Sequence, residues 1–72
     1  MTTIIKSKKI ERYYITLSVS LNYQGFNVYD VMIGEQVGES ELYNTRLCKF
    51  YNDRTQATKA YNYYRRKIEK EI

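Results

Sequence analysis

FYNDRTQATKAYNYYRRKIEKEI, residues 50–72, carries the pattern of a helix that lies on the rest of the chain. Its apolar side chains recur at steps of three and four residues, which places them on one side of a helix of about 18 residues. This apolar stripe consists of Ala57, Ala60, Tyr61, Tyr64 and Ile68. Asn52 or Asp53 can cap the start of the helix, and Gln56 follows Asp53 at close to the spacing of a capping box. We therefore predict a C-terminal helix that packs on a sheet formed by the preceding strands.

The side of this helix that faces away from the stripe is cationic. At roughly 100° per residue, several side chains fall within about 60° of one another. They are Lys59, Tyr63, Arg66 and Lys70, with Arg65 and Lys67 on their flanks. We predict that these six residues form a surface that binds a partner. The alternative is an ordinary solvated helix face, in which basic side chains lie near the helix C-terminus because the helix dipole favours them there.

Length and composition restrict what the chain can be. We expect residues 1–72 to form a single domain, and a domain of this size buries only about 60% of the surface of its unfolded chain. Cys48 is the only cysteine and there is no histidine, so we expect no disulfide, no metal and no cofactor. Residues 1–9 lack the apolar run of a signal peptide, and no segment approaches the ~20 apolar residues of a membrane span. We therefore expect a cytoplasmic protein that does not contact a membrane.

The net charge of +4 is distributed unevenly along the chain. Residues 1–12 carry four basic and one acidic side chain, which gives +3. Residues 13–45 carry four acidic side chains and no Lys or Arg, which gives −4, and residues 46–72 carry eight basic and three acidic side chains, which gives +5. This asymmetry can steer an acidic partner, and it can equally promote head-to-tail self-association.

A β-hairpin is predicted in the middle of the chain. Residues 13–21 alternate between apolar and polar side chains, which is typical of a half-buried strand. The apolar set directed toward the core is Tyr13, Ile15, Leu17, Val19 and Leu21. Asn22-Tyr23-Gln24-Gly25 has the residues of a tight turn, and a three-residue loop would pair Leu21 with Asn27.

That pairing decides which side of the second strand is buried. It directs Tyr29, Val31 and Ile33 toward the core and leaves Asp30 on the outer face, where its carboxylate does not have to be buried without a partner. The outer face then consists of Tyr14, Thr16, Ser18 and Ser20 with Phe26, Val28, Asp30 and Met32. A loop of two or four residues would reverse this arrangement.

Residues 34–40, GEQVGES, are predicted as the next break, and a third strand is expected within residues 41–51. Its alternation directs Cys48 and Phe50 inward, and Leu47 to the other face unless a bulge intervenes. Phe50 is expected to pack under the start of the helix. Residues 1–9 are predicted as a flexible basic arm or a short edge strand.

Together these elements predict an α+β fold of the order β-β-β-α. Three strands form an antiparallel meander, and one C-terminal helix covers one face of it. The first and third strands are then edges, which the Lys-rich N-terminus or a second copy of the chain could protect.

The sequence contains no catalytic constellation. Without histidine the commonest general base is missing, and nothing in the sequence would activate Cys48. The Glu35, Glu39 and Glu41 spacing fits a solvated turn rather than a calcium loop. We therefore predict a protein that is not an enzyme.

Tyrosine is the unusual residue of this chain, with nine copies and no Trp. Four tyrosines are expected in the core, namely Tyr13, Tyr29, Tyr61 and Tyr64. Tyr14 and Tyr63 are expected to point outward, and exposed Tyr beside Arg and Lys suits either a protein interface or stacking on single-stranded nucleic acid.

Two further surfaces are candidates for binding. A second interface is expected on the open sheet face, at Tyr14, Phe26, Val28 and Met32, unless the N-terminal arm covers it. Lys6, Lys8 and Lys9 could form an arm that contacts nucleic acid.

The chain resembles the very small proteins carried by phages and mobile elements, including anti-CRISPR inhibitors. The resemblance lies in the short basic start, the Tyr-rich hairpin, and the passage through Phe50-Tyr51-Asn52-Asp53 into the helix with Ala57, Ala60, Tyr61 and Tyr64. It implies inhibition by occupancy, in which the protein binds a host complex and blocks the access of nucleic acid or a conformational step. Many such inhibitors are acidic mimics of DNA, and the charge of +4 departs from that pattern. This chain would therefore engage an acidic protein surface or the nucleic acid itself.

Three hypotheses of function follow from the sequence. The first is a non-enzymatic binding protein, phage- or element-borne, that inhibits or modulates a host protein or nucleoprotein complex. The second is a small basic protein that binds DNA or RNA directly through the Tyr/Arg/Lys side of the helix. The third is a structural homodimer.

Overall fold

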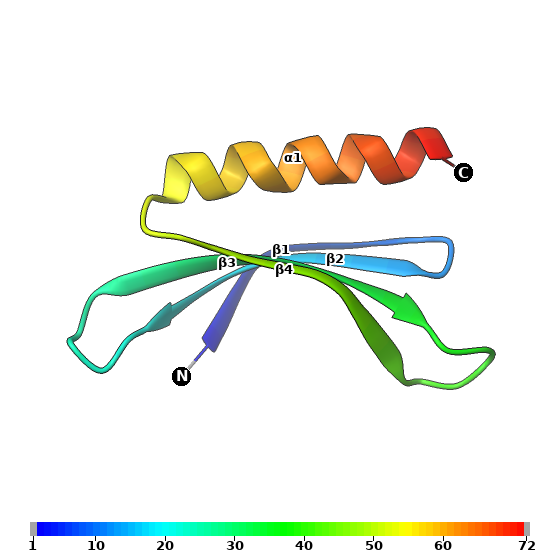
Figure 1. The fold of residues 1–72 in the computed structure, drawn as a ribbon, viewed down its shortest axis with the longest axis horizontal. Coiled ribbons are helices and arrows are strands. Elements are labelled where there is room, and N and C mark those ends of the chain that lie inside the picture. The colour runs from blue at the N-terminus through cyan, green and yellow to red at the C-terminus, as the bar shows by residue number, and fades with distance from the viewer. Residues whose placement is uncertain (1, 72) are drawn as a thin grey trace.

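Four antiparallel strands and one helix make up the fold in a computed structural model, which describes residues 2–71 (Figure 1). The strands are β1 (Thr2–Ile10), β2 (Tyr13–Leu21), β3 (Asn27–Gln36) and β4 (Tyr43–Tyr51), and the helix is α1 (Arg54–Glu71). They form one sheet in the order β1-β2-β3-β4, with α1 on one of its faces. The predicted α+β class and the C-terminal helix are confirmed, whereas the predicted number of three strands is wrong.

The additional strand is β1, at the place where we predicted an arm or a short edge strand. Eight of its nine residues pair with β2, from Thr2 opposite Ser20 to Ile10 opposite Tyr13. Ile5 and Ile10 pack against the core on the helix side, and this burial holds the segment in the sheet. The flexible arm is therefore wrong for residues 2–9, and Met1 lies outside the described residues. β1 and β4 are the edges of the sheet.

The β2–β3 hairpin has the predicted register, with Leu21 opposite Asn27. The Asn22 side-chain oxygen accepts hydrogen bonds from the backbone N–H groups of Gln24 (2.9 Å) and Phe26 (3.0 Å). Gly25 has φ of 86°, a value that glycine adopts without strain. The core prediction is confirmed in the middle of the hairpin, where Ile15, Leu17, Val31 and Ile33 are buried. It is wrong at Leu21, which lies beside the turn and is 63% exposed.

The β3–β4 hairpin agrees with the predicted break at Gly38 and differs from it at Gly34. β3 continues to Gln36, so Gly34 lies inside a strand and only Gly38 has a positive φ, of 60°. A Cβ at Gly34 would stand 3.2 Å from the Cβ of Tyr43, and the Tyr43 ring packs against the ring of Tyr14 with centroids 5.9 Å apart. Glycine at position 34 therefore lets two tyrosines meet over the strand.

The side chains of β4 lie on the opposite faces of the sheet from those predicted. Cys48 and Phe50 are exposed, Phe50 to 69%, whereas Leu47 is half-buried against the core. The reason is pairing: Cys48 lies opposite Met32 and Phe50 opposite Asp30, both on the outer face of β3. A bulge does occur, since the partner of Ile33 is Leu47 and the partner of Gly34 is Thr45, which leaves Arg46 as the extra residue. Tyr51, not Phe50, packs under the start of the helix.

Helix α1 forms as predicted. Asp53 caps it, since the Gln56 backbone N–H donates to the Asp53 carboxylate at 3.2 Å. Ala57, Tyr61 and Ile68 are buried, and Ala60 and Tyr64 are half-buried against the same core. The other predicted core tyrosines, Tyr13 and Tyr29, also pack there, partly buried.

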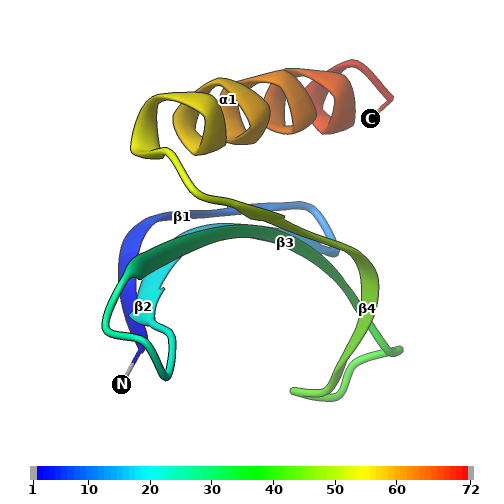
Figure 2. The ribbon, with the colours of Figure 1, turned by 60° about the vertical axis from the view of Figure 1, so that its left-hand side comes forward.

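The sheet is strongly curved. The β2–β3 and β3–β4 hairpin tips bend away from α1 in both views, so the helix lies on the convex face and the opposite face is concave (Figure 2). Bulges increase the local bend of a strand, and both edge strands carry one, between Ile4 and Lys6 in β1 and at Arg46 in β4.

Candidate binding surface

The helix side that faces solvent is the first candidate surface, and five of its six predicted members are exposed. We call these five the basic helix face: Lys59, Tyr63, Arg66, Lys67 and Lys70. The side chains come together because all project from one side of α1, while the alanines and tyrosines of the other side hold the helix on the sheet. Within residues 2–71, the four cations of this face form no ion pair.

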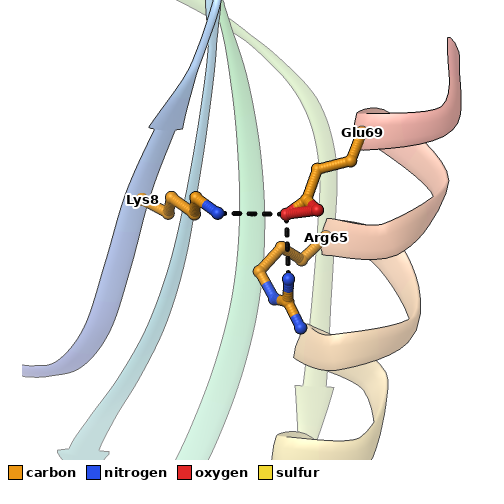
Figure 3. Close-up of polar contacts among 3 residues, drawn as sticks. All are labelled: Lys8, Arg65 and Glu69. Carbon is orange, nitrogen blue, oxygen red and sulfur yellow. Dashed lines mark hydrogen bonds and ion pairs between the residues drawn. The ribbon is translucent and has the colours of Figure 1, made fainter. Parts of the chain in front are cut away.

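Arg65, the sixth predicted member, is placed elsewhere. It is half-buried and donates to Glu69 at 2.8 Å, and Glu69 also accepts from Lys8 of β1 at 3.1 Å (Figure 3). These hydrogen bonds hold the pKa of the Glu69 carboxyl below its ordinary value, Lys8 having the larger effect. Arg65 and Lys8 therefore join the helix to the edge of the sheet.

A second carboxylate accounts for two more of the basic side chains. Glu35 of β3 lies between Arg12 at 3.1 Å and Arg46 at 2.6 Å, and its own side chain is only 16% exposed. Glu35 of the sheet and Glu69 of α1 thus pair Lys8, Arg12, Arg46 and Arg65. The four cations of the basic helix face, by contrast, have no acidic partner within residues 2–71. This makes that face a candidate for binding an external partner.

Tyr63 is the aromatic residue of the basic helix face, and 58% of it is exposed. Its ring meets the edge of the half-buried Tyr64 ring, with centroids 5.1 Å apart and planes at 78°. On the outer side, Tyr63 borders a shallow hollow of about 350 Å³ whose other lining residues are Arg66, Lys67 and Lys70. An aromatic ring fixed beside three cations is suited to a partner with an acidic or a π-rich surface.

The predicted basic arm does not exist as one site. Lys6 and Lys8 lie in β1 opposite Leu17 and Ile15, which places them on the helix side, whereas Lys9 lies opposite Tyr14 on the other face. Lys8 is also committed to Glu69. The three lysines therefore lie on two faces of the sheet and not on one surface.

The second predicted interface is open. β1 lies beside β2 in the sheet and not over it, so the proposed cover by an N-terminal arm is wrong. Phe26 and Met32 are 66% and 37% exposed, while Tyr14 and Val28 are half-buried. Three large apolar side chains that sequence reasoning did not assign to this face join them through strand pairing: Ile4, Tyr43 and Phe50.

Asp30 lies in the middle of this sheet face. Its neighbours across the sheet are Ser18 in β2 and Phe50 in β4, and burial raises the pKa of the Asp30 carboxyl above its ordinary value of 3.8. The prediction that Asp30 lies on the outer face is confirmed.

Cys48 is exposed on the sheet face, opposite Met32 and not in the core as predicted. In residues 2–71, no group of three or more thiol or carboxyl side chains is placed to hold a metal ion. Helix α1 is too polar to cross a membrane.

Comparisons of the chain with family models, with curated protein sequences and with solved structures gave no match. The resemblance to small phage and mobile-element inhibitors therefore stays a prediction.

Proposed function

We propose that this chain is a non-enzymatic binding protein that acts by occupancy. In this proposal the basic helix face docks on an acidic surface of a host protein or nucleoprotein complex and blocks access to it, as anti-CRISPR inhibitors of phages and mobile elements do. The observation that carries the proposal is the unequal use of charge. Glu35 and Glu69 pair Lys8, Arg12, Arg46 and Arg65. The other eight cations form no ion pair among residues 2–71, and four of these eight gather on one side of α1.

The composition of this face agrees with a protein interface. Interface cores are enriched in Tyr and Arg, and truncation of such anchors typically removes most of the binding energy. Tyr63 and Arg66 border the same hollow. We therefore assign them the role of anchors and assign Lys59, Lys67 and Lys70 to the charged rim, where they steer an acidic partner toward the face.

The test is affinity capture from a lysate of the native host, with and without nuclease. The double variant Tyr63→Ala/Arg66→Glu should lose the captured partner and keep its circular dichroism spectrum and melting temperature, because both side chains are exposed. The matched control is Tyr23→Ala/Arg54→Glu, which makes the same chemical changes at exposed positions away from the basic helix face. Retained capture by the folded double variant, or equal loss in the control, would contradict the proposal.

Direct binding of nucleic acid is the second candidate function. Tyr63 beside Arg66, Lys67 and Lys70 resembles the combination of ring stacking and phosphate contact found in proteins that bind single strands. Affinity for an oligonucleotide should then fall steeply with salt, because each neutralised phosphate releases counterions. A titration with single- and double-stranded oligonucleotides at two salt concentrations decides this, and no binding at low salt removes the candidate.

A structural homodimer remains the third possibility from the sequence. Light scattering over a range of protein concentrations tests it, since the mass of a reversible dimer rises with concentration.

A further inference from the structure

The face of the sheet opposite α1 is concave and uncovered by any element within residues 2–71 (Figure 2). We call it the concave face and define it by Ile4, Asp30, Met32, Tyr43 and Phe50. Four of the ten large apolar side chains that are exposed among residues 2–71 lie on it, and strand pairing brings them together. Exposed apolar groups of this extent on a soluble chain mark interaction surfaces.

The shape of the concave face suits a convex partner. Its floor in β2 is made of small side chains, Thr16, Ser18 and Ser20, while larger ones stand on the neighbouring strands. In the row through Ser18, Ile4 of β1 stands on one side and Phe50 of β4 on the far side, 57% and 69% exposed. The β2–β3 and β3–β4 hairpins bend away from α1 at opposite ends of the sheet, so the sheet is curved along its strands (Figures 1 and 2). A helix laid across the strands follows this curvature, whereas a flat surface does not.

The charge of the concave face selects the partner. Asp30 lies at its centre and forms no ion pair with any described residue. β2, β3 and the turn to β4 contain no Lys or Arg, and the other acid of β3, Glu35, is paired on the helix side. Lys9, in edge strand β1, shares the face but is not paired with Asp30. A partly buried carboxylate among apolar side chains is complemented by a cation.

We propose that the concave face is a second docking site, and that its occupant is a basic amphipathic helix of a partner protein. The apolar side of that helix packs on Ile4, Met32 and Phe50, and one Lys or Arg within its apolar stripe pairs with Asp30. This is the helix-in-groove mode of recognition, in which anchors recur at steps of three and four residues. The site does not use the basic helix face, so the chain would contact two surfaces at once.

Cys48 makes the proposal testable in the natural protein. It is the only thiol, it is exposed, and it lies on the concave face opposite Met32. The probe is a synthetic 18-residue helical peptide with a leucine stripe and one lysine at the centre of that stripe; an otherwise identical peptide carries glutamate there. The rate at which N-ethylmaleimide alkylates Cys48 is measured in the presence of each peptide. The backbone amide chemical shifts of the protein are recorded by NMR in the same mixtures.

The lysine peptide should slow alkylation in a saturable way and shift the amides of β2, β3 and β4 more than those of α1. The Asp30→Asn variant should bind it about tenfold more weakly, because a charge-assisted hydrogen bond is lost. Asp30→Lys should reverse the preference in favour of the glutamate peptide. Glu71→Gln, which removes an exposed acid from the helix, is the matched control and should change nothing.

Three results would overturn the proposal: no protection by either peptide, equal protection by both peptides in the natural protein, or shifts confined to α1. Protection that grows with protein concentration alone would assign the face to a second copy of this chain and would also overturn it. The variant Tyr63→Ala/Arg66→Glu should keep the full peptide response. Loss of host-partner capture therefore tests the basic helix face, and loss of Cys48 protection tests the concave face. The two proposals can fail independently.

Discussion

Asp30 and Glu69 are two carboxylates whose surroundings move their pKa values in opposite directions. Glu69 accepts hydrogen bonds from Lys8 and Arg65, and these lower its pKa, so its contribution to stability is present above its ordinary pKa of 4.5 and is lost as the pH falls through its value in the folded state. Burial raises the pKa of Asp30, so the folded state favours the protonated form. Ionisation of Asp30 therefore costs stability as the pH rises through its ordinary value of 3.8 and beyond.

The variant Asp30→Asn isolates this cost. Compared with the natural protein, the variant should gain more stability at pH 7 than at pH 3. The reason is that the natural side chain is uncharged at the lower pH and carries no desolvation cost there. Urea unfolding followed by circular dichroism at the two pH values measures the difference. A relative stability that is the same at both pH values, or that is greater at pH 3, would show that the Asp30 carboxylate is not held in a desolvated place.

At the scale of single elements, α1 lies close to the sheet because small side chains face it. Ala57 is completely buried and Ala60 partly buried, both over the core made by Ile15, Leu17, Val31 and Ile33. Close-packed interiors accommodate an added side chain only by moving their neighbours. The distance of α1 from the sheet is therefore fixed at Ala57.

Replacing Ala57 by Leu should destabilise the protein by about 1–3 kcal/mol, the usual cost of overpacking a core. Lys59→Leu adds a leucine to the same helix at an exposed position and is the control. Thermal unfolding of both variants measures the effect. An Ala57→Leu variant as stable as the Lys59→Leu variant would mean that α1 is not packed on the sheet as the structure describes.

The elements also show what local sequence can predict. The β2–β3 hairpin and α1 were predicted because their patterns of period two and period 3.6 lie within one continuous stretch. β1 was missed as a full strand because its bulge hides the pattern: Ile4 and Ile10 are six residues apart, yet they lie on opposite faces of the sheet. β4 was assigned the wrong face because its orientation is set by pairing with β3, where Met32 lies opposite Cys48. Pairing between strands that bulge is a property of the fold and cannot be taken from one strand alone.

The same distinction holds for the two candidate surfaces. The basic helix face could be predicted because all of its side chains come from one helix. The side of β2 and β3 that forms the concave face was predicted at Tyr14, Val28 and Met32, whereas Phe26, predicted with them, lies in the turn before β3. Ile4, Tyr43 and Phe50 were not assigned to it, because they lie on the two edge strands whose register is shifted by bulges.

The molecule as a whole presents two faces of different chemistry. On the outside of α1 lie four cations that form no ion pair with residues 2–71, and the concave side of the sheet presents apolar groups around one carboxylate. Between them, the buried apolar core of residues 2–71 is limited to Ile15, Leu17, Val31, Ile33, Ala57, Tyr61 and Ile68. A core of this size gives a small domain only modest stability, so binding of a partner at either face should raise the melting temperature.

The central claim is that the basic helix face lies against another macromolecule in the functional complex. The most direct measurement is lysine footprinting, in which a captured complex and the isolated protein are treated with an acetylating reagent and the modified lysines are quantified by mass spectrometry. Lys59, Lys67 and Lys70 should react more slowly in the complex, because rim lysines that contact acids of the partner are less accessible to the reagent, while Lys6 and Lys49 of the sheet should react at unchanged rates. Equal reactivity of Lys59, Lys67 and Lys70 in the complex and in the isolated protein would contradict the claim.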